Sequence, residues 1–506
     1  YPTSPTTCLL YTDSRQQLNS GTFKMVSLPN EIFLEIVKYF PPINKFHDPS
    51  DVLEEYNITK NTLASLCLVS KIWRDIAQPL LYRTYIKTED FDPNIAHDEY
   101  IEAKIEAMEA QGIDIQTIPD EEFEYTDYRQ PVSLESFIRT MIERLDLAER
   151  VECLSISNYC DENEKRLYAR TDVDKALGES MFNASLRVPS QETPWGWRYP
   201  SEWQKNWRNE LRKGDEVAEV ALLMFILPNI RFLDLGTSSE TYGTHVQNLW
   251  CQLLGSQPGE DVEFPSQIET PLMLSCLESF SARVDGHTYG EAPNIDIVEE
   301  ILMIPSLKYF YCGGLQQSTG ENICLPLAHI QQVFINDCWI SEEALLFIIG
   351  SFRQLTALDV VWYRECCDGF TKYFLMALIE RKETLERLSL LLPPFAMQRV
   401  PELSIYAPFD LRQLTNLKVL SIDYEIIFSE RETRPEEDHH DNPKFPYNLP
   451  RSIENLNIQY CRLDEDMAEC ASYLLDCRHK YDKLKYIQLT YENFEPKNDA
   501  EKDQLL

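Results

Sequence analysis

The chain has 506 residues, of which 47 are basic and 83 acidic, giving a formal charge of −36 and a sequence pI of about 4.6. Its 43% apolar residues, with 26 Tyr, 23 Phe and 8 Trp, suffice for a large core and exclude a chain that is disordered throughout. The excess of acid repels phosphate backbones and anionic lipids, so we expect neither a nucleic acid nor a membrane as partner.

The ends and the cysteines indicate a compartment. No apolar run approaches the ~20 residues of a membrane span, and no basic-then-apolar leader opens the chain. Residues 1–24 are polar, and we expect them to form a disordered extension before Met25. The 14 Cys contain no CxxC pair, which favours reduced, mostly buried thiols and a cytoplasmic or nuclear location.

Two helices are predicted near the N-terminus, separated by an inserted polar loop at 42–60. Pro29 stands near the start of the first helix, where its missing N–H is harmless, and Pro41 ends it. Asn61 and Thr62 are expected to cap the second helix, and Pro79 to end it. The apolar stripes are Ile32, Ile36 and Phe40 in the first helix, and Leu63, Leu66, Val69, Trp73 and Ile76 in the second.

This segment resembles an F-box, on the matches Leu28-Pro29-x-Glu31-Ile32, Ile36, Leu66, Val69-Ser70-Lys71-x-Trp73 and Pro79-Leu80-Leu81-Tyr82-Arg83, the last as in fungal members. Typical members have a short loop where this chain has residues 42–60. The resemblance implies a helical module at 25–88 that docks on a Skp-family adaptor and, through it, on a cullin-based ubiquitin ligase. The implied contact residues are Leu28, Pro29, Ile32, Ile36, Leu66, Val69 and Trp73.

Those same side chains could instead form only the core of a small helical domain. Two or three short helices bury little surface alone, so we expect an apolar remainder that needs a partner. The acidic connector that follows, 89–130, also has two interpretations: a docking strip for a basic partner, or a solvated linker. We favour the linker, because charge runs are usually solvated.

From residue 131 a pattern with apolar residues at offsets 0, 3 and 5 occurs ten times. From Leu277 onward its starts fall 30, 23, 25, 30, 32, 36 and 31 residues apart, near the period of leucine-rich repeats. Helical segments are predicted between some of them, at 344–352, 370–381 and 467–480. The ten sets start at Val151, Ile230, Leu277, Leu307, Ile330, Leu355, Leu385, Leu417, Ile453 and Leu484.

Cys338 and Cys461 each stand eight residues after a start, where we expect the chain to turn a small side chain inward. They resemble the cysteine-containing leucine-rich repeats that commonly follow an F-box. The implied fold is α/β, with the helical module followed by a degenerate leucine-rich-repeat solenoid over 131–492, parallel strands on the concave face and helices on the convex face, and a tail at 493–506.

Residues between the apolar offsets should face outward and provide a surface for a protein target. An ordinary solvent-facing sheet is the alternative interpretation for most of them. Exposed aromatic residues concentrate binding energy, which favours Tyr311, Phe334 and Tyr363. The full set of predicted target contacts is Tyr311, Phe334, Asn336, Asp359, Tyr363 and Asp423.

Two insertions interrupt the array. The first, 160–214, contains Trp195, Trp197, Trp203 and Trp207, and either folds over the concave face to grip a target or supplies a small core of its own, which we favour. The second, 429–447, is polar and contains His439 and His440, but two adjacent His without a convergent ligand do not predict a metal site.

The sequence shows no Gly-rich phosphate loop, G-x-S-x-G elbow or HExxH motif, so we predict no catalytic residue and no cofactor. The predicted function is the substrate-recognition subunit of a ubiquitin ligase of the Skp–cullin–F-box (SCF) type. The alternative is a leucine-rich-repeat interaction scaffold that acts outside ubiquitin transfer, and a hydrolase hidden in the 160–214 insertion has no motif in its favour.

Overall fold

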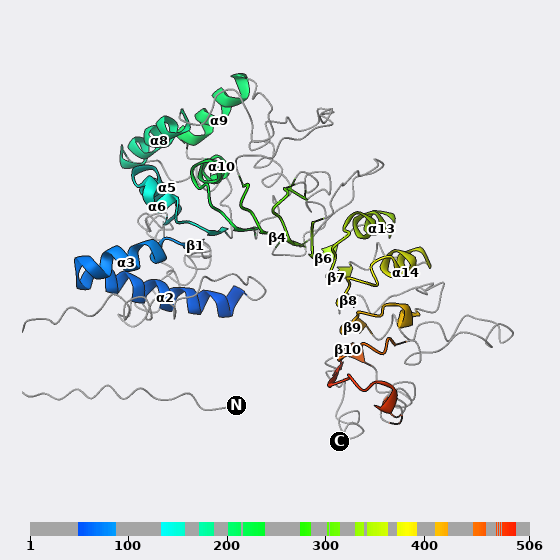
Figure 1. Ribbon diagram of the computed structural model, residues 1–506. Coiled ribbons are helices and arrows are strands. Elements are labelled where there is room, and N and C mark those ends of the chain that lie inside the picture. The colour runs from blue at the N-terminus through cyan, green and yellow to red at the C-terminus, as the bar shows by residue number, and fades with distance from the viewer. Residues whose placement is uncertain are drawn as a thin grey trace, which may run out of the picture. The chain divides into compact units, whose positions relative to one another are not determined.

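A computed structural model describes residues 49–87, 133–156, 172–186, 201–213, 216–237, 274–284, 301–302, 304–313, 329–338, 342–362, 372–391, 410–423, 449–461 and 478–491, and residues 472, 474 and 476 (Figure 1). The contacts divide the chain into Tyr1–Pro41 and Pro42–Leu506, and every described residue belongs to the second unit. Residues 1–24, the predicted first helix, the connector 89–130, the loop 429–447 and the tail 493–506 therefore lie outside the described residues.

The helix pair at the start of the described chain consists of α2 (Pro49–Val69) and α3 (Lys71–Leu81), and α2 begins earlier than the sequence predicts. The loop prediction for 42–60 is therefore wrong from residue 49 onward. Tyr56 and Leu63 are buried and stand seven residues apart, which places both on one face of the helix. The apolar pattern was obscured because Lys60 and Asn61 separate the two side chains in sequence.

A break at Ser70 divides what the sequence predicted as one continuous helix. Ser70 is extended, with φ −162° and ψ 166°, and its hydroxyl accepts a hydrogen bond from the Trp73 N–H at 3.2 Å. This N-cap begins helix α3, which spans Lys71–Leu81. Pro79 lies inside α3 and does not end it, because the helix continues to Leu81 before Tyr82 closes it.

The described strands form one parallel sheet of eleven, in which every strand pairs with the next in chain order (Figure 1). The ten sets of apolar offsets predict β2 to β11. Strand β1 was missed because its offsets hold Tyr82, Tyr85 and Lys87, and the lysine breaks the pattern. The strands are β1 (Thr84–Lys87), β2 (Cys153–Ile156), β3 (Phe232–Thr237), β4 (Ser279–Val284), β5 (Tyr309–Gly313), β6 (Gln332–Cys338), β7 (Ala357–Trp362), β8 (Arg387–Leu391), β9 (Val419–Asp423), β10 (Asn455–Cys461) and β11 (Tyr486–Tyr491).

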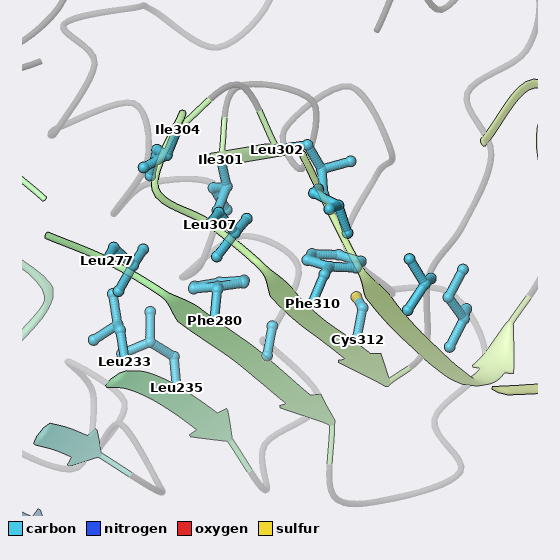
Figure 2. Close-up of a cluster of buried hydrophobic side chains, with 14 of the residues drawn as sticks. Leu233, Leu235, Leu277, Phe280, Ile301, Leu302, Ile304, Leu307, Phe310 and Cys312 are labelled. Carbon is cyan, nitrogen blue, oxygen red and sulfur yellow. The ribbon is translucent and has the colours of Figure 1, made fainter. Parts of the chain in front are cut away.

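The three apolar offsets form continuous rows inside the core. Leu233, Phe280 and Phe310 are consecutive partners across β3, β4 and β5, and the two rings lie 6.1 Å apart (Figure 2). In β2 to β10 every offset residue is at most 2% exposed. Each strand therefore buries apolar surface against both neighbours, which is the main source of stability in such stacking.

Helices cover the core side of the sheet. Helices α13 (Glu342–Ser351) and α14 (Lys372–Ile379) lie at the predicted positions, and buried Phe352 and Phe374 belong to the continuous core. The remaining elements are α5 (Ser133–Glu143), α6 (Leu145–Ala148), α8 (Asp172–Ser185), α9 (Ser201–Lys213), α10 (Glu216–Ile226), and the short 3-10 helices η5 (Leu411–Gln413) and η8 (Arg478–Lys480).

The Trp-rich insertion joins the main core through Trp207. This side chain in α9 is 3% exposed, donates from Nε1 to the Ala218 carbonyl at 3.2 Å and packs against Phe225 of α10. The prediction of a separate small core is thus wrong for Trp207, since its core is continuous with that of the sheet. Trp195 and Trp197, and the side chain of Trp203, lie outside the described residues.

Strands β6 and β10 both end in the predicted cysteine, and in both the register shifts just before it. The shift brings Cys461 inward, where it is 3% exposed and its thiol contacts the Ile458 carbonyl at 3.3 Å. The inward turn is therefore confirmed for Cys461, while the Cys338 side chain lies outside the described residues. Burial also raises the pKa of Cys312 to about 12, so this thiol stays protonated.

A row of alternating charges runs along the residues that immediately precede the strands. We call these residues the charge ladder: Arg83, Glu152, Arg231, Glu278, Lys308, then neutral Gln331 and Thr356, then Glu386, Lys418, Glu454 and Lys485. Each member after Arg83 donates its backbone N–H to the carbonyl of the preceding member, at 2.7 to 2.9 Å. The register that buries the core thus also aligns the charges.

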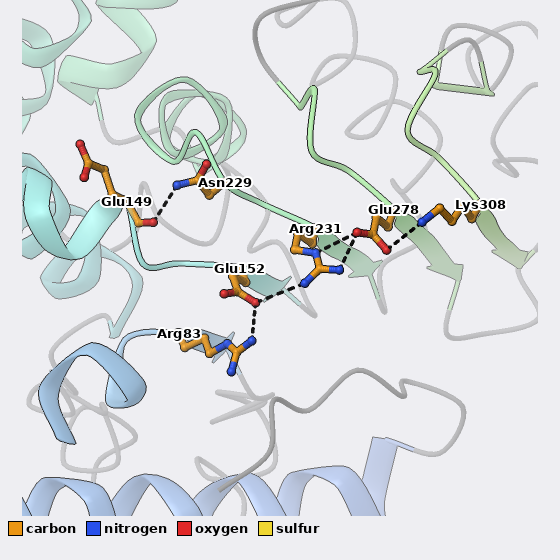
Figure 3. Close-up of polar contacts among 7 residues, drawn as sticks. All are labelled: Arg83, Glu149, Glu152, Asn229, Arg231, Glu278 and Lys308. Carbon is orange, nitrogen blue, oxygen red and sulfur yellow. Dashed lines mark hydrogen bonds and ion pairs between the residues drawn. The ribbon is translucent and has the colours of Figure 1, made fainter. Parts of the chain in front are cut away.

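The charged side chains of the ladder pair across strands (Figure 3). Glu152 contacts Arg83 at 2.7 Å and Arg231 at 3.8 Å. Glu278 accepts from Arg231 at 2.5 Å and contacts Lys308 at 3.4 Å. Pairs in the second half include Lys418 with Glu386 at 2.8 Å and Lys485 with Glu454 at 2.6 Å.

We predict that Glu278→Gln lowers the free energy of unfolding by about 1 kcal/mol at neutral pH, the upper range for a partly exposed ion pair. Burial raises the pKa of Glu278, but the hydrogen bond from Arg231 and the charges of Arg231 and Lys308 outweigh it, so the pKa is below the usual value. The stabilisation is therefore complete above the unfolded pKa of about 4.3 and disappears as the pH falls through the lower folded value.

Urea denaturation of both proteins between pH 3 and pH 7 measures this difference. Exposed Glu380→Gln is the matched control, and we expect it to change little at either pH. A loss that is equally large at pH 3 and pH 7 would contradict the ion-pair explanation.

Candidate functional site

Three aliphatic side chains at the junction of α2 and α3 are unusually exposed. Leu68 is 82% exposed, Val69 58% and Ile72 51%. We call these three residues the junction patch. Clustered exposed apolar side chains are costly in water and mark surfaces that bind other proteins.

The Ser70 cap fixes the backbone that presents the junction patch. The Arg74 N–H donates to the Ser70 carbonyl at 2.9 Å, and Arg74 Nε donates to the Cys67 carbonyl at 3.2 Å. The second bond satisfies a carbonyl at the end of α2 that lacks an intrahelical partner. The two helices are therefore locked at the point where the patch lies.

The predicted adaptor-contact residues fall in two groups. Val69 lies in the junction patch, and Leu66 and Trp73 are half-buried beside it in sequence. Leu28, Pro29, Ile32 and Ile36 lie outside the described residues. Sequence reasoning missed Leu68 and Ile72 because a single continuous helix puts them off its apolar stripe. The Ser at position 70, a preferred N-cap, was the signal that could have indicated the break.

The helix pair connects directly to the sheet. Strand β1 follows α3 after two residues, and the Ile86 N–H at the outer edge of β1 donates to the Tyr56 hydroxyl of α2 at 3.3 Å. Tyr85 of β1 stacks on Phe137 of α5 with ring centroids 3.9 Å apart. Burial raises the pKa of Tyr56 to about 12, so its hydroxyl stays neutral. The helix pair thus covers the first edge of the sheet.

The second candidate surface is the sheet face opposite the core. One row of residues crosses it in register, and we call it the central row: Ser155, Asp234, Ser281, Tyr311, Phe334, Asp359, Ser389, Ser421, Asn457 and Gln488. Two pairs of neighbouring members are joined by side-chain hydrogen bonds: Ser155 donates to Asp234 at 2.6 Å, and Asn457 donates to Ser421 at 3.2 Å. The row is thus polar, with an aromatic section in β5 and β6.

Tyr311 is the accessible residue of that aromatic section, and Asn336, outside the central row, contacts it. Both are half-buried, and Asn336 Nδ2 donates to the Tyr311 hydroxyl at 2.7 Å. The Tyr311 ring lies 6.5 Å from that of Phe334. Asp359 is also half-buried and is paired in register with Phe334.

Two predicted target contacts are buried instead of exposed. Phe334 is 9% exposed and Asp423 is 0% exposed, so the expectation that both face solvent is wrong. Residue alternation predicts which side of a strand a residue faces, but not how far its neighbours cover it. Strands stand ~4.8 Å apart, so Phe334 loses exposure to its partners in register, Tyr311 and Asp359. Tyr363 lies outside the described residues.

In the part of the chain that the structure describes, no three His, Cys, Asp or Glu residues are grouped to hold a metal ion. Among those same residues, no helix has both the length and the apolar character that crossing a bilayer requires.

Comparison with known protein families gives a match at the N-terminal helix pair. Residues 25–87 match the F-box-like family, and this match includes α2, α3 and β1. F-box domains bind Skp-type adaptors. No protein with curated annotation matches the chain.

We predict that Tyr56→Phe lowers the free energy of unfolding by about 1 kcal/mol, the typical worth of one hydrogen bond, because the Ile86 N–H loses its acceptor. Hydrogen exchange should become faster in the peptide that contains residues 84–87. Tyr309→Phe in β5 is the matched control and should leave this peptide unchanged. Equal exchange in Tyr56→Phe and the native chain would show that α2 does not hold this edge.

Proposed function

We propose that this chain is the substrate-recognition subunit of an SCF-type ubiquitin ligase, of the fungal type, acting in the cytoplasm or nucleus. Its helical module docks on a Skp-family adaptor and thereby on cullin, and its strand array binds the target protein. The observation that supports this most directly is the junction patch, which exposes three aliphatic side chains within the segment that matches the F-box-like family.

Burial of the junction patch would provide the docking energy. Complete burial of a Val, Leu or Ile side chain is worth ~1.5–3 kcal/mol, and these three are exposed by half or more. The neighbouring cations are Lys71, whose long stem can keep its charge in water, and Arg74, whose Nε is already bonded to the Cys67 carbonyl. A partner with a complementary apolar groove would therefore gain most from exactly this junction.

The array supports the second half of the proposal as a leucine-rich-repeat solenoid. Eleven parallel strands follow in chain order, and the offset residues of β2 to β10 share one buried pattern. The central row then provides the target surface, with Tyr311 and Asp359 as its accessible members and Asn336 as an accessible contact beside it. Phe334 supports the Tyr311 ring from the next strand. Tyr363 remains a predicted contact.

Such a subunit needs no catalytic residue. Holding a target near a ubiquitin-charged enzyme raises the effective concentration of the reacting groups. Because β1 joins the helix pair to the sheet, the distance from adaptor to target would be held by direct contacts such as Tyr56 with Ile86. An interaction scaffold outside ubiquitin transfer would share the target surface but would not bring cullin with the adaptor.

We predict that Val69→Asp/Ile72→Asp lowers adaptor affinity by at least about tenfold, since two desolvated carboxylates oppose docking. Both side chains are exposed, so the thermal midpoint should not change. Arg139→Asp on exposed α5 surface is the matched control.

Co-purification with a Skp-family adaptor and cullin measures the outcome. The double variant Leu28→Ala/Pro29→Ala tests the first part of the motif in the same assay. If both double variants co-purify with native levels of adaptor, the proposed docking site is wrong. If the native chain co-purifies with adaptor but not with cullin, the result favours an interaction scaffold that acts outside ubiquitin transfer.

We predict that Tyr311→Ala/Asn336→Ala abolishes target retention and leaves adaptor binding unchanged, because the two surfaces share no residue. Mass spectrometry of proteins retained by the native and variant chains identifies the target, whose half-life should lengthen in cells that carry the variant. Gln413→Ala on exposed η5 surface is the control. An unchanged set of retained proteins would exclude the central row as the target surface.

A further inference from the structure

The last strand of the described sheet has one unpaired side. No strand that the structure describes lies beyond β11, and its Tyr486 and Ile487 are 69% and 43% exposed. In β9 and β10 the residues in register with Ile487 are Leu420 and Leu456, which are at most 1% exposed. The apolar pattern thus continues to β11, but its burial does not.

A strand that is preceded by a basic ladder residue is usually followed by a strand that is preceded by a glutamate. Arg83, Arg231 and Lys418 of the charge ladder are each followed on the next strand by a glutamate, and only Lys308 is followed by neutral Gln331. Each of those glutamates heads the sequence Glu-x-apolar-x-apolar: Glu152-x-Leu154-x-Ile156, Glu278-x-Phe280-x-Ala282 and Glu454-x-Leu456-x-Ile458. Lys485 heads β11, and no described strand follows β11 to place a glutamate on its other side.

The backbone of β11 repeats the arrangement of the earlier strands. The Glu454 carbonyl accepts from Lys485 N–H at 2.7 Å and from Tyr486 N–H at 3.2 Å. The Lys485 carbonyl is the equivalent acceptor for a next strand. By the alternation of parallel pairing, the N–H groups of Ile487 and Leu489 face that same side.

The charge near this edge is locally reversed. Exposed Lys480, Lys483 and Lys485 lie within six residues, with one exposed acid, Asp482, among them, in a chain whose total is −36. Lys485 pairs with Glu454 at 2.6 Å, and the earlier cation Arg231 contacts a glutamate on each side. Lys485 can therefore serve a second carboxylate in the same way.

We propose that the open edge of β11 binds an extended acidic segment of a partner protein, which adds as a further parallel strand. The segment has the pattern acid-x-apolar-x-apolar: its carboxylate pairs with Lys485, and its two apolar residues cover Ile487 and Leu489. This mode of recognition takes affinity from the strand backbone and specificity from alternate side chains. The proposal does not depend on adaptor docking.

A second copy of this chain fits the edge less well. Its free edge for parallel pairing would be β1, which is headed by Arg83 and would place one cation beside Lys485. The Ile86 N–H on that edge already donates to Tyr56. Both observations favour a different partner over head-to-tail self-association.

A fluorescent peptide with the sequence of residues 452–460, which contains Glu454-x-Leu456-x-Ile458, is the probe for the full chain. We expect saturable binding by fluorescence anisotropy, reduced about tenfold or more by Ile487→Asp and by Lys485→Glu. A peptide with Glu454→Lys should bind the native chain as weakly as the unchanged peptide binds the Lys485→Glu variant. Its affinity should recover when it is paired with the Lys485→Glu variant, because the charges are then opposite again. Lys382→Glu, an exposed site far along the sequence, is the charge control.

Hydrogen exchange and thermal midpoints complete the test. Residues 484–491 should exchange rapidly in the free chain and slow on peptide binding, and Ile487→Asp should keep the native midpoint because Ile487 is exposed. The proposal is overturned by absent saturable binding, by binding that both variants leave unchanged, by slow exchange of this edge in the free chain, or by self-association through it. Ile487→Asp and Lys485→Glu should leave co-purification with the adaptor unchanged. That assay therefore distinguishes a failure of the β11 proposal from a failure of the proposed function.

Discussion

In-register stacking of parallel strands is the constraint on which the rest of this structure depends. An apolar offset that is buried in one of the strands β2 to β10 is buried in its neighbours, so Leu233, Phe280 and Phe310 form one row, and the ladder from Arg83 to Lys308 forms another. The apolar rows supply most of the stability, while the charged row adds a smaller contribution. The charged row instead favours the correct order of strands, because a strand placed beside the wrong neighbour would lose its pairing of opposite charges. The same register places Tyr311 beside Phe334 and leaves Ile487 exposed at the end.

Periodicity predicted this part of the fold well, because every strand that faces the shared core needs apolar residues at the same offsets, and these can be read from the sequence of each strand. It failed where a single residue departs from the pattern for another reason. Lys87 hides β1, whose position at the edge of the sheet requires only two apolar offsets, Tyr82 and Tyr85. Ser70 divides a helix by a capping bond that an apolar count does not include. Alternation assigned Phe334 and Asp423 to the outer face, but alternation does not determine how far a residue is covered, and both are buried.

The candidate adaptor site shows the same limit at the level of residues. Val69 was predicted from the family resemblance and is exposed, whereas Leu68 and Ile72 became visible only once the junction was known. Their exposure results from the helix break, which is a local backbone event. The attachment of this site to the sheet through Tyr56 is not predictable from the sequence, because residues 49–60 are polar enough to predict a loop and only the structure shows Tyr56 and Leu63 buried on one face of α2.

The alternating charges also restrict how such an array can change its length during evolution. Duplication or loss of one repeat inside Arg83–Lys308 or Glu386–Lys485 would place two like charges side by side, whereas a change of two repeats would preserve the alternation. Gln331 and Thr356 are neutral, so a single repeat can enter or leave there without repulsion. The ladder therefore favours the gain or loss of repeats two at a time. A single repeat can be gained or lost without such repulsion only at the neutral interval of Gln331 and Thr356.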